Sequence, residues 1–150
     1  MFNKIFFFLF LSSLLNAQQY IIINLSEQVA YAIEDGSIVF DGFISSGKRG
    51  RETPEGEYTI LQKKRYHTSN LWPKPNGGAK MPYMLRLTNT GIAMHLGYVP
   101  NRPASHGCVR LEDGFAQEMF SWAKVGMKVY IEGSAFEERG YYDDDYMIMD

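Results

Sequence analysis

The pattern of apolar and polar positions predicts short β-strands over most of the chain. Residues 20–25 form an isoleucine-rich apolar run, typical of a buried strand, and apolar residues alternate with small or polar ones over 29–33. Asp35 and Gly36 form a strong hairpin turn, and residues 37–44 provide the return strand. Further strands are predicted at residues 57–61, 83–88, 92–95 and 127–131.

One segment has helical spacing instead. Apolar residues recur at intervals of three and four over residues 112–124, which predicts an amphipathic helix that ends near Gly126. The spaced residues are Phe115, Met119 and Trp122. The whole pattern predicts a mainly β fold, a β-sandwich or open barrel with antiparallel strands and one packed helix. Residues 66–81 fit no pattern, and we interpret them either as a lid over a functional site or as a surface excursion.

Composition narrows the class of protein. The chain has 150 residues, 45% of them hydrophobic, so it is long enough for one domain with a buried core. Its formal net charge of −2 argues against a dedicated nucleic-acid binder, because such domains are strongly basic. A single cysteine excludes an intramolecular disulfide and a multi-cysteine zinc site, and we expect no metal and no cofactor.

The two ends of the chain differ from its body. Residues 1–17 carry a lysine near the start, seven apolar residues at 5–11 and a final Ala17, which predicts a cleaved signal peptide. A bilayer span needs about 20 apolar residues, so we expect no stable membrane span after cleavage; an uncleaved anchor is the alternative. Residues 134–150 carry six acidic residues and one arginine and form either a poorly ordered acidic tail or a segment that docks on the body. The predicted domain is 18–133.

Candidate chemistry concentrates in residues 95–110, which hold the one cysteine and two of the three histidines. The thiolate of a cysteine is a nucleophile and a nearby imidazole can take its proton, so Cys108 with His95 or His106 is the minimum machinery for acyl transfer. His95 is favoured as the base because it ends a separate predicted strand, whereas His106 lies two residues from the cysteine. The alternative for Cys108 is a buried inert thiol.

Neighbouring residues add further candidates. Backbone N–H groups near a nucleophile stabilise the oxyanion of acyl transfer, and glycine lets a carbonyl approach closely, so the amides of Gly107 and Cys108 are candidate donors. Arg110 is either a ligand for a substrate carboxylate or an ordinary surface arginine. His67, in the patternless loop, is expected to be a solvated surface residue.

The sequence SHGCVR at residues 105–110, with His95 upstream, resembles the signature of the L,D-transpeptidase catalytic domain family of the YkuD type. The resemblance covers about residues 19–132. It includes the segments 21–36, 45–48 (SSGK) and 53–56 (TPEG).

The resemblance implies a mostly β fold with a cysteine-centred cleft, in which Cys108 is the nucleophile and His95 accepts and donates the proton. The other motif residues would support the site or bind substrate: His106, Gly107, Ser105 and Arg110. Two features depart from the family's pattern. Leu96 follows His95 where a glycine is common, which leaves open the carbonyl that orients the histidine, and the loop to Cys108 is short.

The implied substrate is the peptide stem of bacterial peptidoglycan. Cys108 would attack the carbonyl of the third stem residue, release the terminal D-alanine and pass the acyl group from a thioester to an amine of a neighbouring stem, forming a 3–3 cross-link. Water as acceptor would make the protein an L,D-carboxypeptidase, and a protein amine would anchor that protein to the wall. The implied location is beyond the inner membrane, in the periplasm or cell envelope.

Two further functions stay open. A secreted cysteine protease would need the same Cys108 and His95 and would degrade a general protein substrate. A wall-binding protein without activity would bind the wall even when Cys108 is replaced by alanine.

Overall fold

The computed structural model describes residues 17–74 and 77–136. The predicted signal peptide, 1–17, lies outside the described residues except for Ala17, and the predicted tail, 134–150, lies outside them beyond residue 136.

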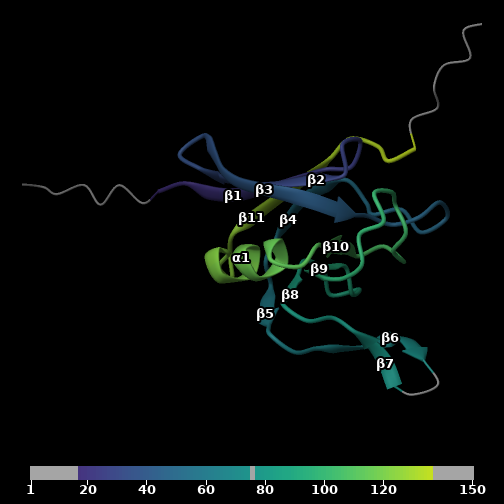
Figure 1. Cartoon of the computed structure of the whole chain (residues 1–150). Helices are drawn as coiled ribbons and strands as arrows, with labels where there is room; N and C mark the ends of the chain where they lie inside the picture. Colours follow the sequence, from purple (N-terminus) through teal and green to yellow (C-terminus); the bar gives the residue numbers. More distant parts are fainter. Residues whose placement is uncertain (1–16, 75–76, 137–150) are drawn as a thin grey trace, which may run out of the picture.

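Within the described residues, nine strands form one curled sheet and two more form a separate ribbon (Figure 1). The sheet order is β4-β11-β1-β2-β3-β10-β9-β8-β5. In chain order the strands are β1 (Gln19–Asn24), β2 (Val29–Glu34), β3 (Ser37–Ser45), β4 (Gly56–Thr59), β5 (Gln62–Lys64), β6 (Thr68–Lys74), β7 (Gly77–Lys80), β8 (Met84–Arg86), β9 (Ala93–Leu96), β10 (Val109–Leu111) and β11 (Lys128–Glu132).

The two edge strands of the sheet are neighbours in the chain. Ile60 and Leu61 alone join β4 to β5. The Ile60 N–H donates to the Met127 carbonyl at 2.9 Å, beside β11 near one edge, and the Leu61 N–H donates to the Arg86 carbonyl at 2.8 Å, on β8 near the other. The sheet therefore curls most of the way to a barrel. The predicted mainly β fold, an open barrel with one packed helix, is confirmed.

Local turn chemistry explains the hairpin of β2 and β3. Asp35 and Gly36 both have positive φ, 51° and 80°, which matches the twist of the flanking strands. The antiparallel pairing of β2 with β3 follows from it.

Two strand pairs run parallel, β1 with β11 and β9 with β10, whereas the sequence pattern predicts antiparallel strands. Parallel neighbours need a long crossover connection. Residues 97–108 provide it between β9 and β10. Alternation along one strand carries no information on the direction of its partner, which is why the pattern missed these pairs.

The helix α1 (Phe115–Trp122) is shorter than the predicted 112–124. Its buried residues, which belong to the main apolar core inside the curl, are Phe115, Ala116 and Met119. The helix ends because Ala123 is extended, with φ −68° and ψ 149°. The prediction that Gly126 ends the helix is wrong, since its N–H donates to the Ile60 carbonyl at 2.8 Å in the turn before β11.

The patternless segment 66–81 holds β6 and β7, which pair with each other outside the main sheet. Figure 1 shows this ribbon projecting from the body of the molecule. Its role as a lid stays a prediction. In the part of the chain that the structure describes, no helix is long and apolar enough to cross a membrane.

Candidate active site

Strands β8, β9 and β10 have two chemically different faces. One face packs on the main core through residues that are fully buried: Leu85, Met94 and Val109. Because successive side chains of a strand point to opposite faces, Arg86, His95 and Arg110 belong to the other face, which we term the site face.

The site face brings together residues that lie far apart in the chain. His95 on β9 and Arg110 on β10 are register partners. Val109 is the register partner of Met94, so Cys108, one residue earlier, lies beside Ala93 and diagonally across from His95. The histidine and the cysteine therefore reach this face from two neighbouring strands, as the sequence predicts.

The ring of His95 is buried, with 8% of the residue exposed, and it has one defined partner. Its Nδ1 lies 2.8 Å from the Leu96 carbonyl oxygen. A carbonyl only accepts, so Nδ1 carries the proton and Nε2 keeps the lone pair of a base. Leu96, which stands at a position where the sequence departs from the family's pattern, thus supplies the orienting carbonyl.

Burial sets the charge of His95. Removal from water lowers the pKa of the imidazole, the bond to the Leu96 carbonyl opposes this, and the positive charges of Arg110 and His67 lower it further. The net direction is down, so the ring is neutral at neutral pH.

The thiol of Cys108 is half-buried and packs against a small apolar cluster of Met81, Met84 and Ala93. Its Sγ donates to the Gly91 carbonyl at 3.5 Å. Burial raises the pKa of the thiol, while the Ala93 backbone and the Arg110 charge act to lower it. The net direction is up, so at neutral pH the resting pair is a thiol and a neutral imidazole.

The two residues that flank His106 hold the cysteine loop from inside. Ser105 is 2% exposed, and its Oγ donates to the Cys108 carbonyl and accepts from the Gly107 N–H at 3.1 Å. Gly107 has φ 120°, a conformation that side-chain-bearing residues rarely adopt. In this structure the Gly107 amide is therefore engaged by Ser105, and both the oxyanion role of Gly107 and the substrate contact of Ser105 stay predictions.

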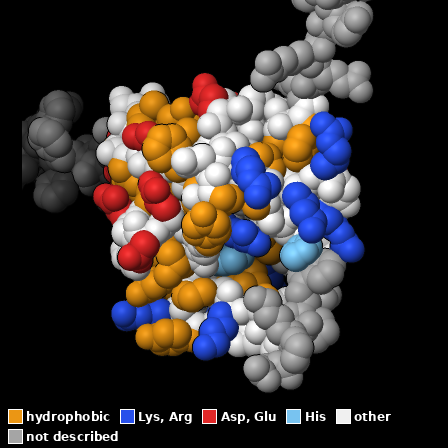
Figure 2. All heavy atoms as spheres, turned by 45° about the vertical axis from the view of Figure 1, so that its right-hand side comes forward, with side chains coloured by type: hydrophobic (Ala, Val, Ile, Leu, Met, Phe, Trp, Pro, Cys, Tyr) orange, Lys and Arg blue, Asp and Glu red, His pale blue; other side chains and the backbone are white. Residues whose placement is uncertain are grey.

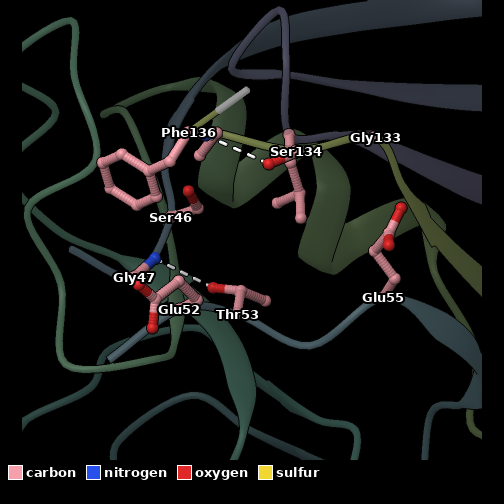
Figure 3. A pocket seen from close by; sticks show the side chains of 10 residues that line it. Ser46, Gly47, Glu52, Thr53, Glu55, Gly133, Ser134 and Phe136 are labelled. Carbon is pink, nitrogen blue, oxygen red and sulfur yellow. Dashed lines mark hydrogen bonds between the residues drawn. The ribbon is translucent and has the colours of Figure 1, made fainter. Parts of the chain in front are cut away.

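Thr53 is a buried connection that sequence reasoning interpreted only as part of a turn. It is 4% exposed. Its Oγ1 accepts from the Gly47 N–H at 2.9 Å (Figure 3) and donates to the Gly107 carbonyl at 2.8 Å. One hydroxyl thus joins three segments that the resemblance names separately, around Gly47, Thr53 and Gly107. The resemblance to the family includes all three segments, and this was the signal in the sequence that they could lie together.

Backbone bonds fix the same loops. Ser46 accepts from the N–H groups of Ala104 and Ser105, both at 3.0 Å, and the Lys48 N–H donates to the Ser105 carbonyl at 3.0 Å. The Ser45 hydroxyl donates to the Arg102 carbonyl at 2.7 Å. The part of the connection between β9 and β10 that directly precedes Cys108 is therefore bonded to the end of β3.

The other histidines lie differently from one another. His106 is exposed, whereas His67 is half-buried and its charge acts on His95. Burial and the charges of Lys64 and Arg86 lower the pKa of His67, so the expectation of a solvated surface residue is wrong. Figure 2 shows histidine side chains among a group of Lys and Arg side chains on one face.

A cavity of about 190 Å³ is lined in part by Thr53 and Gly47 (Figure 3), and neither Cys108 nor His95 lines it. The described start of the tail forms one wall. The Ser134 N–H donates to Ser26 Oγ at 3.0 Å, and the Arg49 guanidinium lies 4.7 Å from the centre of the Phe136 ring. Residues 134–136 thus contact the body, and the rest of the predicted tail lies outside the described residues.

Within the described ranges, no group of three or more His, Cys, Asp or Glu side chains is placed to hold a metal ion.

Comparisons with known proteins identify one family. The family described as L,D-transpeptidase catalytic domain, YkuD, matches residues 18–131. Among solved structures, an L,D-transpeptidase from Stackebrandtia nassauensis is 25% identical with a TM-score of 0.69, and the match covers 82% of this chain and 62% of that one. An L,D-transpeptidase from Mycobacterium smegmatis is 21% identical with a TM-score of 0.71, covering 78% and 59%.

A third solved structure is that of L,D-transpeptidase 3 from Mycobacterium tuberculosis in complex with a faropenem-derived adduct. It is 22% identical with a TM-score of 0.68, and the match covers 78% of this chain and 61% of that one. The chain thus spans about three fifths of the length of these structures. A comparison with curated proteins found no match.

Proposed function

The chain belongs to the L,D-transpeptidase catalytic domain family, and from this premise we propose that it is a peptidoglycan L,D-transpeptidase with Cys108 as its nucleophile. The single observation that carries the residue assignment is the site face. Parallel strands β9 and β10 hold a buried imidazole and a thiol as diagonal neighbours, with the imidazole oriented by the Leu96 carbonyl.

In the proposed first half-reaction, Nε2 of His95 takes the Cys108 proton as Sγ attacks the carbonyl of the third stem residue. The Leu96 carbonyl holds Nδ1–H and stabilises the imidazolium that forms. The C–N bond to the terminal D-alanine then breaks, and His95 returns the proton to the leaving amine. The product is a thioester on Cys108.

In the second half-reaction an amine of a neighbouring stem attacks the thioester and gives a proton to His95. The new amide is the 3–3 cross-link, and the proton returns to the thiol. One amide bond is exchanged for another, so the balance needs no external energy source or cofactor. Water as acceptor gives tripeptide stems, the L,D-carboxypeptidase alternative, and a protein amine gives a wall-anchored protein.

The proposed roles of the remaining residues follow from their positions. Arg110, the register partner of His95, would bind a substrate carboxylate, and Ser105 and Gly107 would hold the loop that carries the nucleophile. His106 is exposed and would support substrate binding. A signal peptide at residues 1–17 would bring the domain, 18–133, with its acidic tail to the periplasm or cell envelope.

The test is mass spectrometry of the products formed from disaccharide-tetrapeptide by the wild type and by Cys108→Ala. A dimer that lacks one terminal D-alanine, made by the wild type alone, is the expected result. Tripeptide alone supports the carboxypeptidase alternative. Cleavage of casein without any change in muropeptides, or binding to sacculi that survives Cys108→Ala without turnover, contradicts the proposal in favour of a protease or a binding protein.

A further inference from the structure

The strands that form the site face carry cations and no acidic residue. Strands β5, β8, β9 and β10 contain no acidic residue. Strand alternation places three cations on this face: Lys64, Arg86 and Arg110. None of them forms an ion pair with a carboxylate of the described residues. The ion pair found among these residues joins Lys128 to Glu57, on β11 and β4.

Arg86 differs from the other two cations by an unmet hydrogen-bonding need. Its Nε is buried and has no hydrogen-bond partner among the described residues. Buried polar groups in folded proteins are nearly always hydrogen-bonded. A guanidinium N–H can only donate, so it needs an acceptor as its partner. An orphaned donor of this kind points to a partner that arrives from outside the chain.

The register aligns Arg86 with the candidate nucleophile. Arg86 is the cross-strand partner of Ala93 on β9, and Ala93 lies beside Cys108, the residue immediately before β10. The three residues form one row across the sheet, all on the site face. Neighbouring strands are about 4.8 Å apart, so the backbone of Arg86 lies about 10 Å from that of Cys108. This is within the span of a peptide whose reacting carbonyl is at the thiol.

We propose that Arg86 binds a carboxylate of the acyl-donor peptide, an inference that rests on the proposed function. The Nε edge of a guanidinium presents two parallel N–H donors that match the two oxygens of a carboxylate. Arg86 lies two strands away from Cys108, and Arg110 lies two residues further along the cysteine's own segment, so the two cations can contact different parts of the donor peptide. Arg86 is a specificity-determining residue and takes no part in proton transfer.

Three carboxylates of a stem tetrapeptide share this chemistry: the terminal one, that of the second residue, and that on the side chain of the third residue. The probes are the tetrapeptide itself and three analogues, each with one of these carboxylates amidated. Binding is measured by calorimetry in the Cys108→Ala background, so that turnover does not interfere. The variants are Arg86→Gln and Arg86→Lys, and the matched control is Lys64→Gln, a cation of the same face on the edge strand β5.

We expect Arg86→Gln to weaken binding of the tetrapeptide about tenfold or more and to leave unchanged the binding of the one analogue that lacks the bound carboxylate. The affinity of Arg86→Lys for the tetrapeptide should lie between those of the parent and Arg86→Gln, because an ammonium keeps the charge but lacks the two parallel N–H donors. Lys64→Gln changes binding less than twofold. The Tm of Arg86→Gln is equal to or above that of the parent, because the Nε of Arg86 has no hydrogen-bond partner to lose.

The proposal is overturned when Arg86→Gln weakens all four peptides equally, when it weakens none, or when the Cys108→Ala protein binds no tetrapeptide. A lower Tm with equal losses identifies Arg86 as structural. Carboxylate-dependent binding in a protein whose wild type forms no product sustains the inference and refutes the proposed transpeptidase activity, so the two failures are distinguishable.

Discussion

Burial shifts the pKa values of His95 and Cys108 in opposite directions. It lowers the pKa of the imidazole and raises the pKa of the thiol, because each loses water around its charged form. Both shifts favour the uncharged pair over a thiolate–imidazolium pair. The residue identities were visible in the sequence, but the resting protonation state follows from the sheet that encloses them.

The pH dependence of turnover tests this state. Activity requires neutral His95, whose pKa is below its ordinary value near 6.5, and a protonated Cys108, whose pKa is above its ordinary value near 8.5. We expect kcat/KM for the donor peptide to be flat across at least about pH 6.5 to 8.5, with the acid limb displaced below this range and the alkaline limb above it. Alkylation of Cys108 by iodoacetamide should still rise above pH 8.5. An alkylation rate already constant at pH 6 contradicts a neutral pair.

The assignment of the base is tested by two histidine variants. His95→Ala should lower kcat by about 10²- to 10⁴-fold, the usual contribution of general acid–base catalysis. His106→Ala should retain measurable turnover, because His106 is exposed and lies on the same segment as the cysteine rather than on the neighbouring strand. Product formation is followed by mass spectrometry, and equal losses in the two variants would refute the assignment.

At the scale of elements, the site depends on loops that cross-brace each other. The connection from β9 to β10 is bonded to the segment after β3 through Ser46 and Lys48. Thr53 joins the same two segments, because its hydroxyl bonds to Gly47 after β3 and to Gly107 in the connection. The strands at 92–95 and 37–44 and the turn at 53–56 were predictable, because alternation and turn residues are local. Their contact was not, since the bond between Thr53 and Gly107 spans 54 residues.

Thr53 should act as a positioning residue. Thr53→Val keeps the shape but leaves the buried Gly47 N–H and Gly107 carbonyl unpaired, which costs about 1–3 kcal/mol for each group in the free energy of unfolding. We expect kcat to fall about tenfold while KM for the donor changes little. Thr53→Ser should restore both kcat and the free energy of unfolding. Thr59→Val on β4 is the control variant. Failure of the serine variant to restore kcat would exclude the hydroxyl as the cause.

At the scale of the whole molecule, the curl of the sheet places both edges against one core. Ile60 lies at the joint between β4 and β5, is 1% exposed and bonds across to Met127. The apolar side chains of both halves and of α1 belong to a single cluster. Closure therefore holds the site face in position, and Arg86 takes part in it through its carbonyl, which accepts from the Leu61 N–H.

Ile60→Ala should lower the free energy of unfolding by about 2–5 kcal/mol, through lost apolar transfer and the remaining cavity. Ile38→Ala is the matched control, because Ile38 is 58% exposed on β3, and its effect should stay within about 0.5 kcal/mol. Urea denaturation measures both. Equal midpoints for the two variants would show that the joint between β4 and β5 does not hold the core together.

The sequence by itself determined the class of fold, the hairpin at Asp35 and Gly36 and the short list of chemical candidates around Cys108. Apolar alternation, turn residues and a cysteine near histidines are local properties, and each is legible in a few consecutive residues. The parallel pairing of β9 with β10, the Leu96 carbonyl on His95, the hydroxyl bridge of Thr53 and the row from Arg86 to Cys108 came only from the tertiary structure. Strand direction, register and burial arise from pairing between distant segments, and these decide which side chains meet and which protons they hold.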